Sequence, residues 1–521
     1  MPPCGKSAKM IEYHKSELLG LAVMVNRRTF LSSAALFAAA GGKAAAKPIP
    51  GPRGPVRLKI GLLSDIHITD RASCSDFEKA LRTFDKWGAD GVLCCGDIAD
   101  WGVAPQIDVT AETWFKVFPG GKRSDGAPMA NLLHYGDHDC CGYFYRGHPG
   151  CVKTYPDVEE MKKVSIRWTD RKAIWEKAFK EEWTPLVHKR VKGYDFVLSH
   201  FTCGEKNNEW GNFVPGLEEF FAKLAPKLEK GKPFFYSQHR IPRMTVGGEF
   251  LYGQDDGKTT ALFKKFPDLC VFCGHKHLPC TDEQAIWQGE FTCVAVPSLR
   301  YCGTQGGRDN GIDDMDKWKD PDWRMPLIPL GHTKQGMFLE VFDDAMVISR
   351  YDFRFDQSLG SKWVVPLPLS GGDHPFDYAR RTAEERAPEL PDGAKISVRR
   401  LVKKERDGKE RDVYEVSVPP ARSKGLSPRA NDYEFQVSTL RRGIERIVAT
   451  KRVYSRGYMF PEKMDADPVV CDFDAAALDP IAYIPIRFTV RPVGAFGTKG
   501  GAACRDFSVA EFSRLADMKK S

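Results

Sequence analysis

The feature that most limits how this chain can fold is a short pattern that occurs five times. Each time, an apolar run of strand length stops abruptly and is followed at once by Asp or His. Such runs are typical of buried strands, and parallel strands bring their carboxyl ends to the sheet edge where α/β folds place their chemistry. The five tips read Asp65-Ile66-His67, Gly96-Asp97, Gly136-Asp137-His138-Asp139, Gln238-His239 and Gly274-His275-Lys276-His277.

The segment between the first two tips has the pattern of a helix. Residues 75–87 carry apolar side chains at helical spacing and are followed by Gly88, a common residue just past a helix end. A strand–helix–strand order predicts parallel strands with right-handed crossovers and a sheet covered on both faces. This rhythm continues over residues 56–366, which we therefore predict to form one α/β domain.

The last part of the chain has a different character. Residues 376–521 contain short alternating strands, and Asp407-Gly408 is a hairpin signal between the first two of them. This pattern predicts an all-β sandwich of ordinary domain size. The run 484–497 resembles the end of a fibronectin type III-like domain.

The first 50 residues resemble a twin-arginine export signal followed by a linker. Arg27-Arg28 precede a short, weakly apolar run over 32–40 and then Ala44-Ala45-Ala46. Residues 1–23 fit no part of such a signal, and Met24 would begin the expected short basic segment. The apolar run is too short to span a bilayer, so we predict no transmembrane helix and a periplasmic or secreted protein. A disordered Ala-rich leader with a chance arginine pair is the alternative.

Composition argues against two other classes of protein. The net charge of +8 is spread over 521 residues without the concentrated basic stripe of a nucleic-acid-binding protein. Many of the 15 cysteines lie inside apolar runs, which favours small buried hydrophobic residues over a disulfide framework.

Carboxylates and imidazoles together at the strand tips suit divalent ions such as manganese, iron or zinc. Two such ions about 3.5–4 Å apart can clamp a phosphate and generate hydroxide between them. Asp97, at the tip of a central strand, is placed to bridge two ions. In an extended backbone, the spacing of Asp65 and His67, and of His275 and His277, would put each pair on one side.

Over residues 57–355 the ordered motifs resemble the calcineurin-like metallophosphoesterase family. The resemblance implies a two-sheet αββα core and a metal-bridging hydroxide that attacks phosphorus in line, without a phospho-enzyme. It also implies that His138 acts as general acid or stabilises phosphoryl charge, and that Asp139 orients His138. The implied metal ligands are Asp65, His67, Asp97 and His277 for one ion, and Asp97, Asp137, His239 and His275 for the other.

One residue departs from the family pattern, which is Gly-Asn-His followed by Asp or Glu. The Asn position holds Asp137, and a carboxylate accepts hydrogen bonds but donates none. It also adds negative charge, which should hold cations more tightly and repel an anionic substrate. Three outcomes stay open: an active site with altered metal preference, a slow enzyme, or a binding site that has lost catalysis.

Other polar residues compete for the same roles. His200 also ends a strand, but a helix precedes the strand of His239, as in the family, so we favour His239. His134 lies within its strand and is expected in the core. Asp100 occupies the position of the tyrosine in purple acid phosphatases, which disfavours a tyrosinate-iron site. Arg240 is expected to meet either substrate phosphate or surface carboxylates.

Together these features predict an exported two-metal hydrolase that cleaves phosphate mono- or diesters of a small molecule or a polymer. The alternative is a non-catalytic exported binding protein whose metal site is structural, which the β-sandwich and Asp137 motivate. The Gly- and Asp-rich segment 302–332 is expected to be a long surface loop that shapes substrate access.

Overall fold

A computed structural model gives the arrangement of most of the chain, which divides into Met1–Pro48 and Ile49–Ser521. The expected export signal, and nearly all of the expected loop 302–332, lie outside the described residues. No helix within the described part of the chain is long and apolar enough to cross a membrane. The structure describes residues 51–518 except 142–162, 168, 204–209, 212–213, 249–253, 303–332, 405–407, 424–428 and 456–467.

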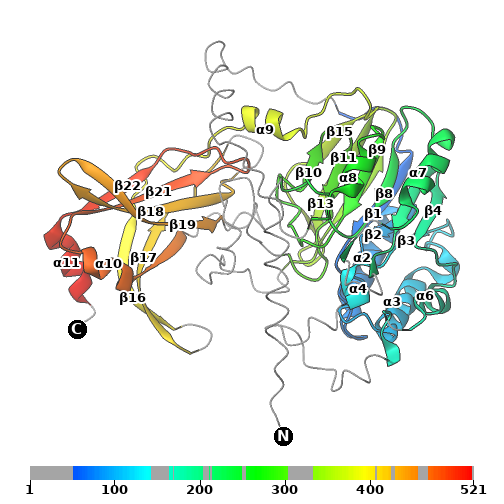
Figure 1. The fold of residues 1–521 in the computed structure, drawn as a ribbon, viewed down its shortest axis with the longest axis horizontal. Coiled ribbons are helices and arrows are strands. Elements are labelled where there is room, and N and C mark those ends of the chain that lie inside the picture. The colour runs from blue at the N-terminus through cyan, green and yellow to red at the C-terminus, as the bar shows by residue number, and fades with distance from the viewer. Residues whose placement is uncertain are drawn as a thin grey trace, which may run out of the picture. The chain divides into compact units, whose positions relative to one another are not determined.

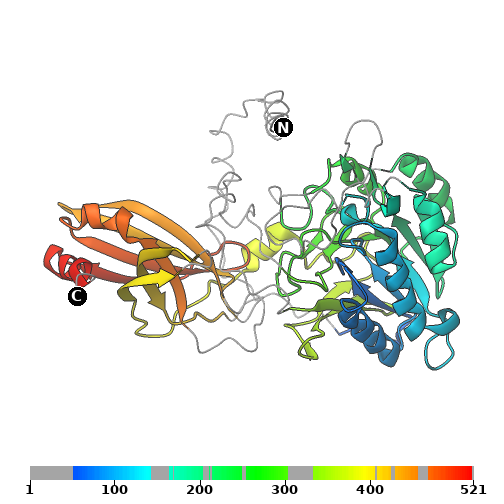
Figure 2. The same cartoon turned by 90° about the horizontal axis from the view of Figure 1, so that it is seen from below.

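The first sheet contains the strands that carry three of the five tips (Figures 1 and 2). Its order is β14-β13-β12-β1-β2-β3, and β15 pairs with β13. Strands β1, β2 and β3 are parallel, whereas β12 is antiparallel to β1. The crossover helices are α2 (Cys74–Trp87) and α3 (Ala104–Val117). The strands are β1 (Leu58–Leu63), β2 (Gly91–Cys94), β3 (Ala130–Leu133), β12 (Gln335–Val341), β13 (Ala345–Asp352), β14 (Gln357–Ser358) and β15 (Trp363–Pro366).

The second sheet carries the other two tips and has the order β10-β11-β9-β8-β5-β4. Strands β5, β8, β9 and β11 are parallel, and β4 and β10 pair antiparallel at the two edges. Helices α7 (Leu217–Leu224) and α8 (Lys258–Phe263) belong to this half. The strands are β4 (Leu186–Val191), β5 (Tyr194–Ser199), β8 (Phe234–Ser237), β9 (Leu269–Cys273), β10 (Ile286–Gln288) and β11 (Thr292–Ala295).

Two apolar clusters explain how these elements stack. Ile60 and Leu62 of β1 share one buried cluster with Phe196 and Phe235 of the second sheet. Leu63 lies in another cluster, with side chains of α2 and α3. Because successive strand residues face opposite sides, β1 contacts the second sheet on one face and the helices on the other. The predicted α/β class with a two-sheet αββα core is confirmed.

The C-terminal strands form two antiparallel sheets over a separate buried cluster. Their orders are β16-β17-β20 and β19-β18-β21-β22. The expected hairpin between β16 and β17 is confirmed by their antiparallel pairing, and the expected all-β region by both sheets. Two helices that we did not predict accompany them, α10 (Ala475–Leu478) and α11 (Val509–Asp517). The strands are β16 (Ser397–Lys404), β17 (Glu410–Val418), β18 (Asp432–Arg441), β19 (Ile444–Tyr454), β20 (Val469–Asp474), β21 (Ile486–Val493) and β22 (Ala503–Phe507).

The cysteines follow the expectation of small buried residues. Every cysteine whose side chain the structure describes is a free thiol, and all of these except Cys504 are buried. Cys94 and Cys95 are fully buried at the end of β2, and Cys270 and Cys273 are fully buried in β9. These thiols therefore contribute to the core as small apolar groups.

Candidate metal centre

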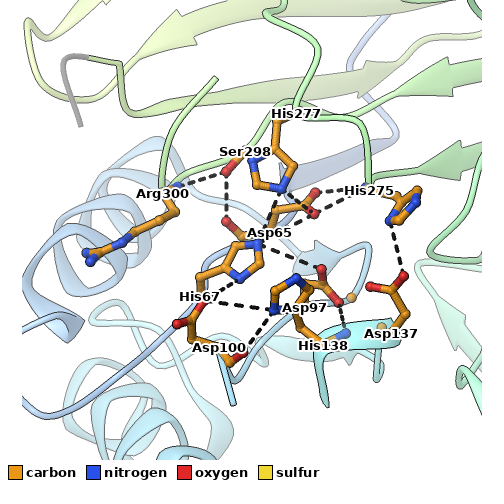
Figure 3. Close-up of polar contacts among 12 residues, drawn as sticks. Asp65, His67, Asp97, Asp100, Asp137, His138, His275, His277, Ser298 and Arg300 are labelled. Atoms are coloured by element: carbon orange, nitrogen blue, oxygen red, sulfur yellow. Dashed lines mark hydrogen bonds and ion pairs between the residues drawn. The ribbon is translucent and has the colours of Figure 1, made fainter. Parts of the chain in front are cut away.

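The five strand tips meet at one place, where the carboxyl ends of the two sheets adjoin (Figure 3). Two backbone hydrogen bonds link the tips of the second sheet to each other and to the first. The N–H of Gly274 donates to the carbonyl of His239 over 2.8 Å, and the N–H of His275 donates to the Asp65 carboxylate. All seven residues predicted as metal ligands are thereby brought together: Asp65, His67, Asp97, Asp137, His239, His275 and His277.

The backbone at these tips is left-handed rather than extended, which corrects one expectation. The φ angles are +49° at Asp65, +44° at His67, +53° at Asp97, +70° at His275 and +50° at His277. Such angles cost a non-glycine residue of order 1–3 kcal/mol and persist only where the surroundings impose them. These positive φ angles therefore mark a site whose backbone geometry is kept although it lowers the stability of the fold. The extended backbone expected at these tips is wrong, because the chain turns immediately after each strand.

The first cluster contains one carboxylate and two imidazoles. His277 Nε2 lies 3.1 Å from Asp65 Oδ1 and 3.3 Å from His67 Nε2. The side chains of Asp65, His67 and His277 are 0 %, 2 % and 6 % exposed. One ligand atom of each residue can therefore face a single ion.

The second cluster has the same composition and lies on the other side of Asp97. His239 Nε2 is 3.3 Å from Asp137 Oδ1, and His275 Nδ1 is 3.4 Å from Asp137 Oδ2. Burial lowers the pKa of His275 to about 4, although Asp137 acts in the opposite direction. The ring is therefore neutral, the form in which an imidazole ligates a metal.

Asp97 lies between the two clusters. Its Oδ2 is 3.1 Å from His239 Nε2 and 3.7 Å from His67 Nε2. Its Oδ1 accepts a hydrogen bond from the N–H of His138 over 2.8 Å. A carboxylate in this position can contribute to both clusters at once.

The residues fit divalent metal ions by a test that does not depend on resemblance. Asp137 Oδ1 and His239 Nε2 are buried and take part in no hydrogen bond with any described residue. Buried polar atoms without a partner are costly, and a metal ion would satisfy both. The mixed carboxylate and imidazole donors suit manganese, iron or zinc.

The imidazoles are held from behind by groups outside the clusters. His67 Nδ1 lies 3.0 Å from Asp100 Oδ1, His277 Nδ1 lies 2.9 Å from the Tyr301 carbonyl, and His239 Nδ1 lies 2.7 Å from the Cys95 carbonyl. Bonds of this kind fix the ring orientation and tautomer of a metal-binding histidine. They direct each Nε2 toward the centre.

Asp100 is the functional residue whose importance sequence reasoning missed. Burial by itself would raise the pKa of its carboxyl, but the hydrogen bond with His67 and the charges of His67 and His138 outweigh burial and lower it. Its backbone carbonyl also lies 2.9 Å from His138 Nδ1. The sequence signal that could have identified Asp100 is its position three residues after Asp97.

The role expected of Asp139 is wrong. Its carboxylate makes no hydrogen bond with His138; its hydrogen bonds in the described structure all come from backbone N–H groups, those of Ile98, Ala99 and Gly136. Asp139 therefore ties the turn after β3 to the turn after β2. The group that contacts the His138 ring is Asp100, which lies closer because α4 (Asp137–Cys141) starts at this point and turns Asp139 inward.

His138 lies beside the first cluster and is partly exposed. Its side chain is 24 % exposed, and its ring centroid lies 4.5 Å from that of His67. Burial alone would lower the pKa of His138, but the charges of Asp97, Asp137 and Asp100 outweigh burial and raise it. The three carboxylates therefore favour the protonated ring more than burial alone would allow.

The rejected histidines lie outside the clusters. His200 Nδ1 accepts a hydrogen bond from the N–H of Tyr135 over 3.0 Å, and its ring packs against that of Trp175 at 4.8 Å. His134 Nε2 lies 2.7 Å from Ser237 Oγ in the core. Both are structural residues, and His239 is the histidine that faces the centre.

The groups at the site differ in how far they are exposed. The carboxylates of Asp65, Asp97 and Asp137 are at most 1 % exposed, whereas the side chains of His275 and Arg240 are 16 % and 15 % exposed. At this accessible edge they are joined by His138 and by the carboxylate of Asp100, which are 24 % and 25 % exposed. An anion approaching the accessible edge would therefore meet N–H groups beside one carboxylate.

Gly136 is a position where any side chain would disturb the centre. An added Cβ would overlap Asp97 Oδ1 and the Asp97 nitrogen and would lie 2.8 Å from His239 Nδ1. We expect Gly136→Ala to lower the free energy of unfolding by about 1–3 kcal/mol and to reduce bound metal, measured by chemical denaturation and elemental analysis. Gly501→Ala, where a Cβ would meet nothing within 4 Å, is the control; equal behaviour of the two variants would contradict the prediction.

Comparison with known proteins shows that part of this chain is similar to a known family. Residues 58–279 match the model of the calcineurin-like phosphoesterase family. No curated protein matches the chain. Among solved structures, the chain is similar to GAP50 of Plasmodium, described as the anchor in the inner membrane complex, with 10 % identity, 60 % of this chain and 89 % of that chain covered, and a TM-score of 0.34.

Two further solved structures are similar to this chain, with comparably low sequence identity. A predicted phosphoesterase from Streptococcus pneumoniae has 9 % identity, covering 59 % of this chain and 97 % of that chain, with a TM-score of 0.24. Zinc-complexed Vps29 from Entamoeba histolytica has 12 % identity, covering 59 % of this chain and 99 % of that chain, with a TM-score of 0.23. These scores carry no information on activity. Over residues 58–279, which include all seven predicted metal ligands, the chain is similar to the calcineurin-like phosphoesterase family.

Proposed function

We propose that this protein is an exported, metal-dependent phosphoesterase that cleaves phosphate mono- or diesters. The observation that carries the proposal is the position of Asp97 between two buried carboxylate–imidazole clusters, 3.1 Å from His239 and 3.7 Å from His67. Arg27-Arg28 and the Ala-rich run after them support export through a twin-arginine-type signal, and therefore a periplasmic or secreted location.

Two divalent ions would be held by the two clusters, and Asp97 would serve both. When bound, such ions neutralise phosphoryl charge and lower the pKa of bound water. Asp65, His67 and His277 would hold one ion, and Asp137, His239 and His275 the other. Elemental analysis would show which of manganese, iron and zinc the protein binds.

The protein's own groups would perform the remaining steps. His138, at the accessible edge and with a raised pKa, would donate a proton to the leaving oxygen of the ester. Asp100, through its carbonyl, would hold the ring of His138 in place. The buried carboxylates would hold the ions inside, and the phosphate would be bound at the accessible edge, where His138, His275 and Arg240 are partly exposed.

The test combines elemental analysis of the purified protein with turnover of p-nitrophenyl phosphate and its bis ester. We expect two equivalents of metal per chain. We expect His138→Asn to lower kcat by about 10²–10⁴-fold without loss of metal. His188→Asn, which removes an exposed imidazole paired with Asp195, should change neither. Folded, metal-loaded protein that turns over neither ester between about pH 5 and 9 would overturn the proposal.

A second candidate function is a non-catalytic binding protein with a structural metal site. It is supported by Asp137 and by the C-terminal three-stranded and four-stranded antiparallel sheets. That division agrees with a sandwich of the fibronectin type III-like kind. Binding of a phosphorylated polymer that survives Asp97→Ala and His138→Ala would favour this candidate.

A further inference from the structure

The residue after His239 is an arginine that lies at the accessible edge. Arg240 Nη2 lies 3.4 Å from Asp137 Oδ2, and its guanidinium carbon lies 5.5 Å from the ring centroid of Phe201. A planar guanidinium stacks on aromatic faces and pairs with carboxylates. These two contacts place the charge of Arg240 against the only predicted ligand that departs from the family pattern.

The two oxygens of Asp137 face different partners. Oδ1 is directed to His239 at 3.3 Å, the side on which an ion would be held. Oδ2 is directed to His275 and Arg240, at 3.4 Å in each case. A carboxamide would combine an acceptor and a donor in one side chain. Here the acceptor belongs to Asp137, and Arg240 supplies a donor beside it on the accessible side.

Lys276 is another cation near Asp137, but it cannot meet a substrate. The residue is 2 % exposed, so its amine is buried. Arg240 has a side chain that is 15 % exposed. Of these two cations, Arg240 is the one at the edge.

We propose that Arg240 is a substrate-binding residue that also compensates the charge of Asp137. Its guanidinium neutralises the carboxylate that would otherwise repel a phosphate, and it donates to a non-bridging phosphoryl oxygen. Because a guanidinium carries five N–H donors in a fixed fork, it can contact Asp137 and a phosphoryl oxygen together. This inference rests on the proposed function for its substrate class, but it concerns anion binding and not turnover.

The experiment is a double-mutant cycle in the full-length, metal-loaded protein. It compares the native protein, Arg240→Met, Asp137→Asn and the double variant, with inorganic phosphate as the calorimetric probe. We expect Arg240→Met to weaken phosphate binding by roughly tenfold or more, since charge-assisted hydrogen bonds of this kind are strong. In the Asp137→Asn background the same change should cost clearly less, because no carboxylate is left to compensate. Arg243→Met, at an exposed arginine three residues further on, is the matched control.

Metal content separates this role from a structural one. Without Arg240 the carboxylate of Asp137 attracts cations more strongly, so elemental analysis should show metal retained while phosphate binding falls. Joint loss of metal and phosphate binding would overturn the proposal. So would equal losses on the two backgrounds, or a loss no larger than that of Arg243→Met. If Arg240→Met does not fold, Arg240→Lys against Arg243→Lys gives the same comparison.

The outcomes also separate this inference from the proposed function. A native protein that binds inorganic phosphate with the expected coupling but cleaves no ester would refute phosphoesterase activity and leave the role of Arg240 intact. A native protein that cleaves p-nitrophenyl phosphate with kcat and KM unchanged by Arg240→Met would refute the role of Arg240 alone.

Discussion

Replacing Asp97 by Asn is expected to abolish most phosphoesterase activity, lowering kcat/KM by about a thousandfold or more. Ions in such sites supply several kcal/mol of transition-state stabilisation, and about 1.4 kcal/mol corresponds to a factor of ten in rate. Asp97 lies between the two clusters, at 3.1 Å from His239 and 3.7 Å from His67. The measurement is kcat/KM for p-nitrophenyl phosphate together with metal equivalents per chain.

Asp100→Asn provides a graded comparison for this result. It removes the carboxylate that lies 3.0 Å from His67 Nδ1 but keeps the backbone carbonyl near His138. Groups that orient metal-binding histidines typically contribute about 10–100-fold in metal affinity or activity, so the effect should be smaller than that of Asp97→Asn. Removal of metal with a chelator should reproduce the Asp97→Asn result in the native protein. Equal activity of Asp97→Asn and native protein, at equal metal content, would exclude a metal-bridging role for Asp97.

Replacing Glu283 by Gln is expected to lower the free energy of unfolding by about 3–5 kcal/mol, the usual cost of breaking a buried ion pair. Glu283 lies between two arginines: Oε1 is 2.8 Å from Arg350 Nη1, and Oε2 is 2.6 Å from Arg381 Nη2. All three side chains are at most 4 % exposed. The amide would leave two buried guanidinium charges without a counter-charge. Denaturant unfolding followed by tryptophan fluorescence measures the loss.

The same residue makes a pH-dependent contribution whose sign can be stated. Burial by itself would raise the pKa of Glu283, but the charges of Arg350 and Arg381 outweigh burial and lower it. A group with a lowered pKa in the folded state stabilises the fold above its unfolded-state pKa, about 4.3 for Glu. That contribution is lost as the pH falls through the folded-state value. Glu283→Gln should therefore remove part of the acid sensitivity of the native protein.

A surface glutamate serves as control for both measurements. Glu290 pairs with Lys264 at 2.8 Å, and the two side chains are about half exposed. Exposed pairs of this kind contribute at most about 1 kcal/mol, so Glu290→Gln should change stability little at any pH. If Glu283→Gln destabilised the protein no more than Glu290→Gln, the three buried charges would not be coupled as their distances indicate.

The position of the site could be predicted from sequence because its signal is local. Each predicted ligand, from Asp65 to His277, directly follows an apolar strand, and parallel strands of one sheet must end at the same edge. The structure places His239, and not His200, in the second cluster. The preference for His239 depended on which strand a helix precedes.

The details of the site could not be predicted because they depend on contacts distant in sequence. The left-handed backbone at Asp65 and His67 is imposed by hydrogen bonds to the next strand tip, at Gly96 and Asp97. Asp139 was misassigned, because adjacency to His138 does not determine which way α4 turns its side chain. Asp100 and Arg240 acquired their roles only when separate loops met around the clusters.

The sequence by itself determined the chemical set: which carboxylates and imidazoles end which strands, and that one of them is Asp137. Hydrophobic periodicity and strand-tip chemistry are properties of neighbouring residues, so they can be read without the fold. Only the tertiary structure decided that Asp97 lies between two clusters, that Asp100 contacts His67, and that Arg240 faces Asp137. These relations arise because two sheets pack face to face and bring their carboxyl ends within a few ångströms, where charge and distance, not sequence order, determine which groups interact.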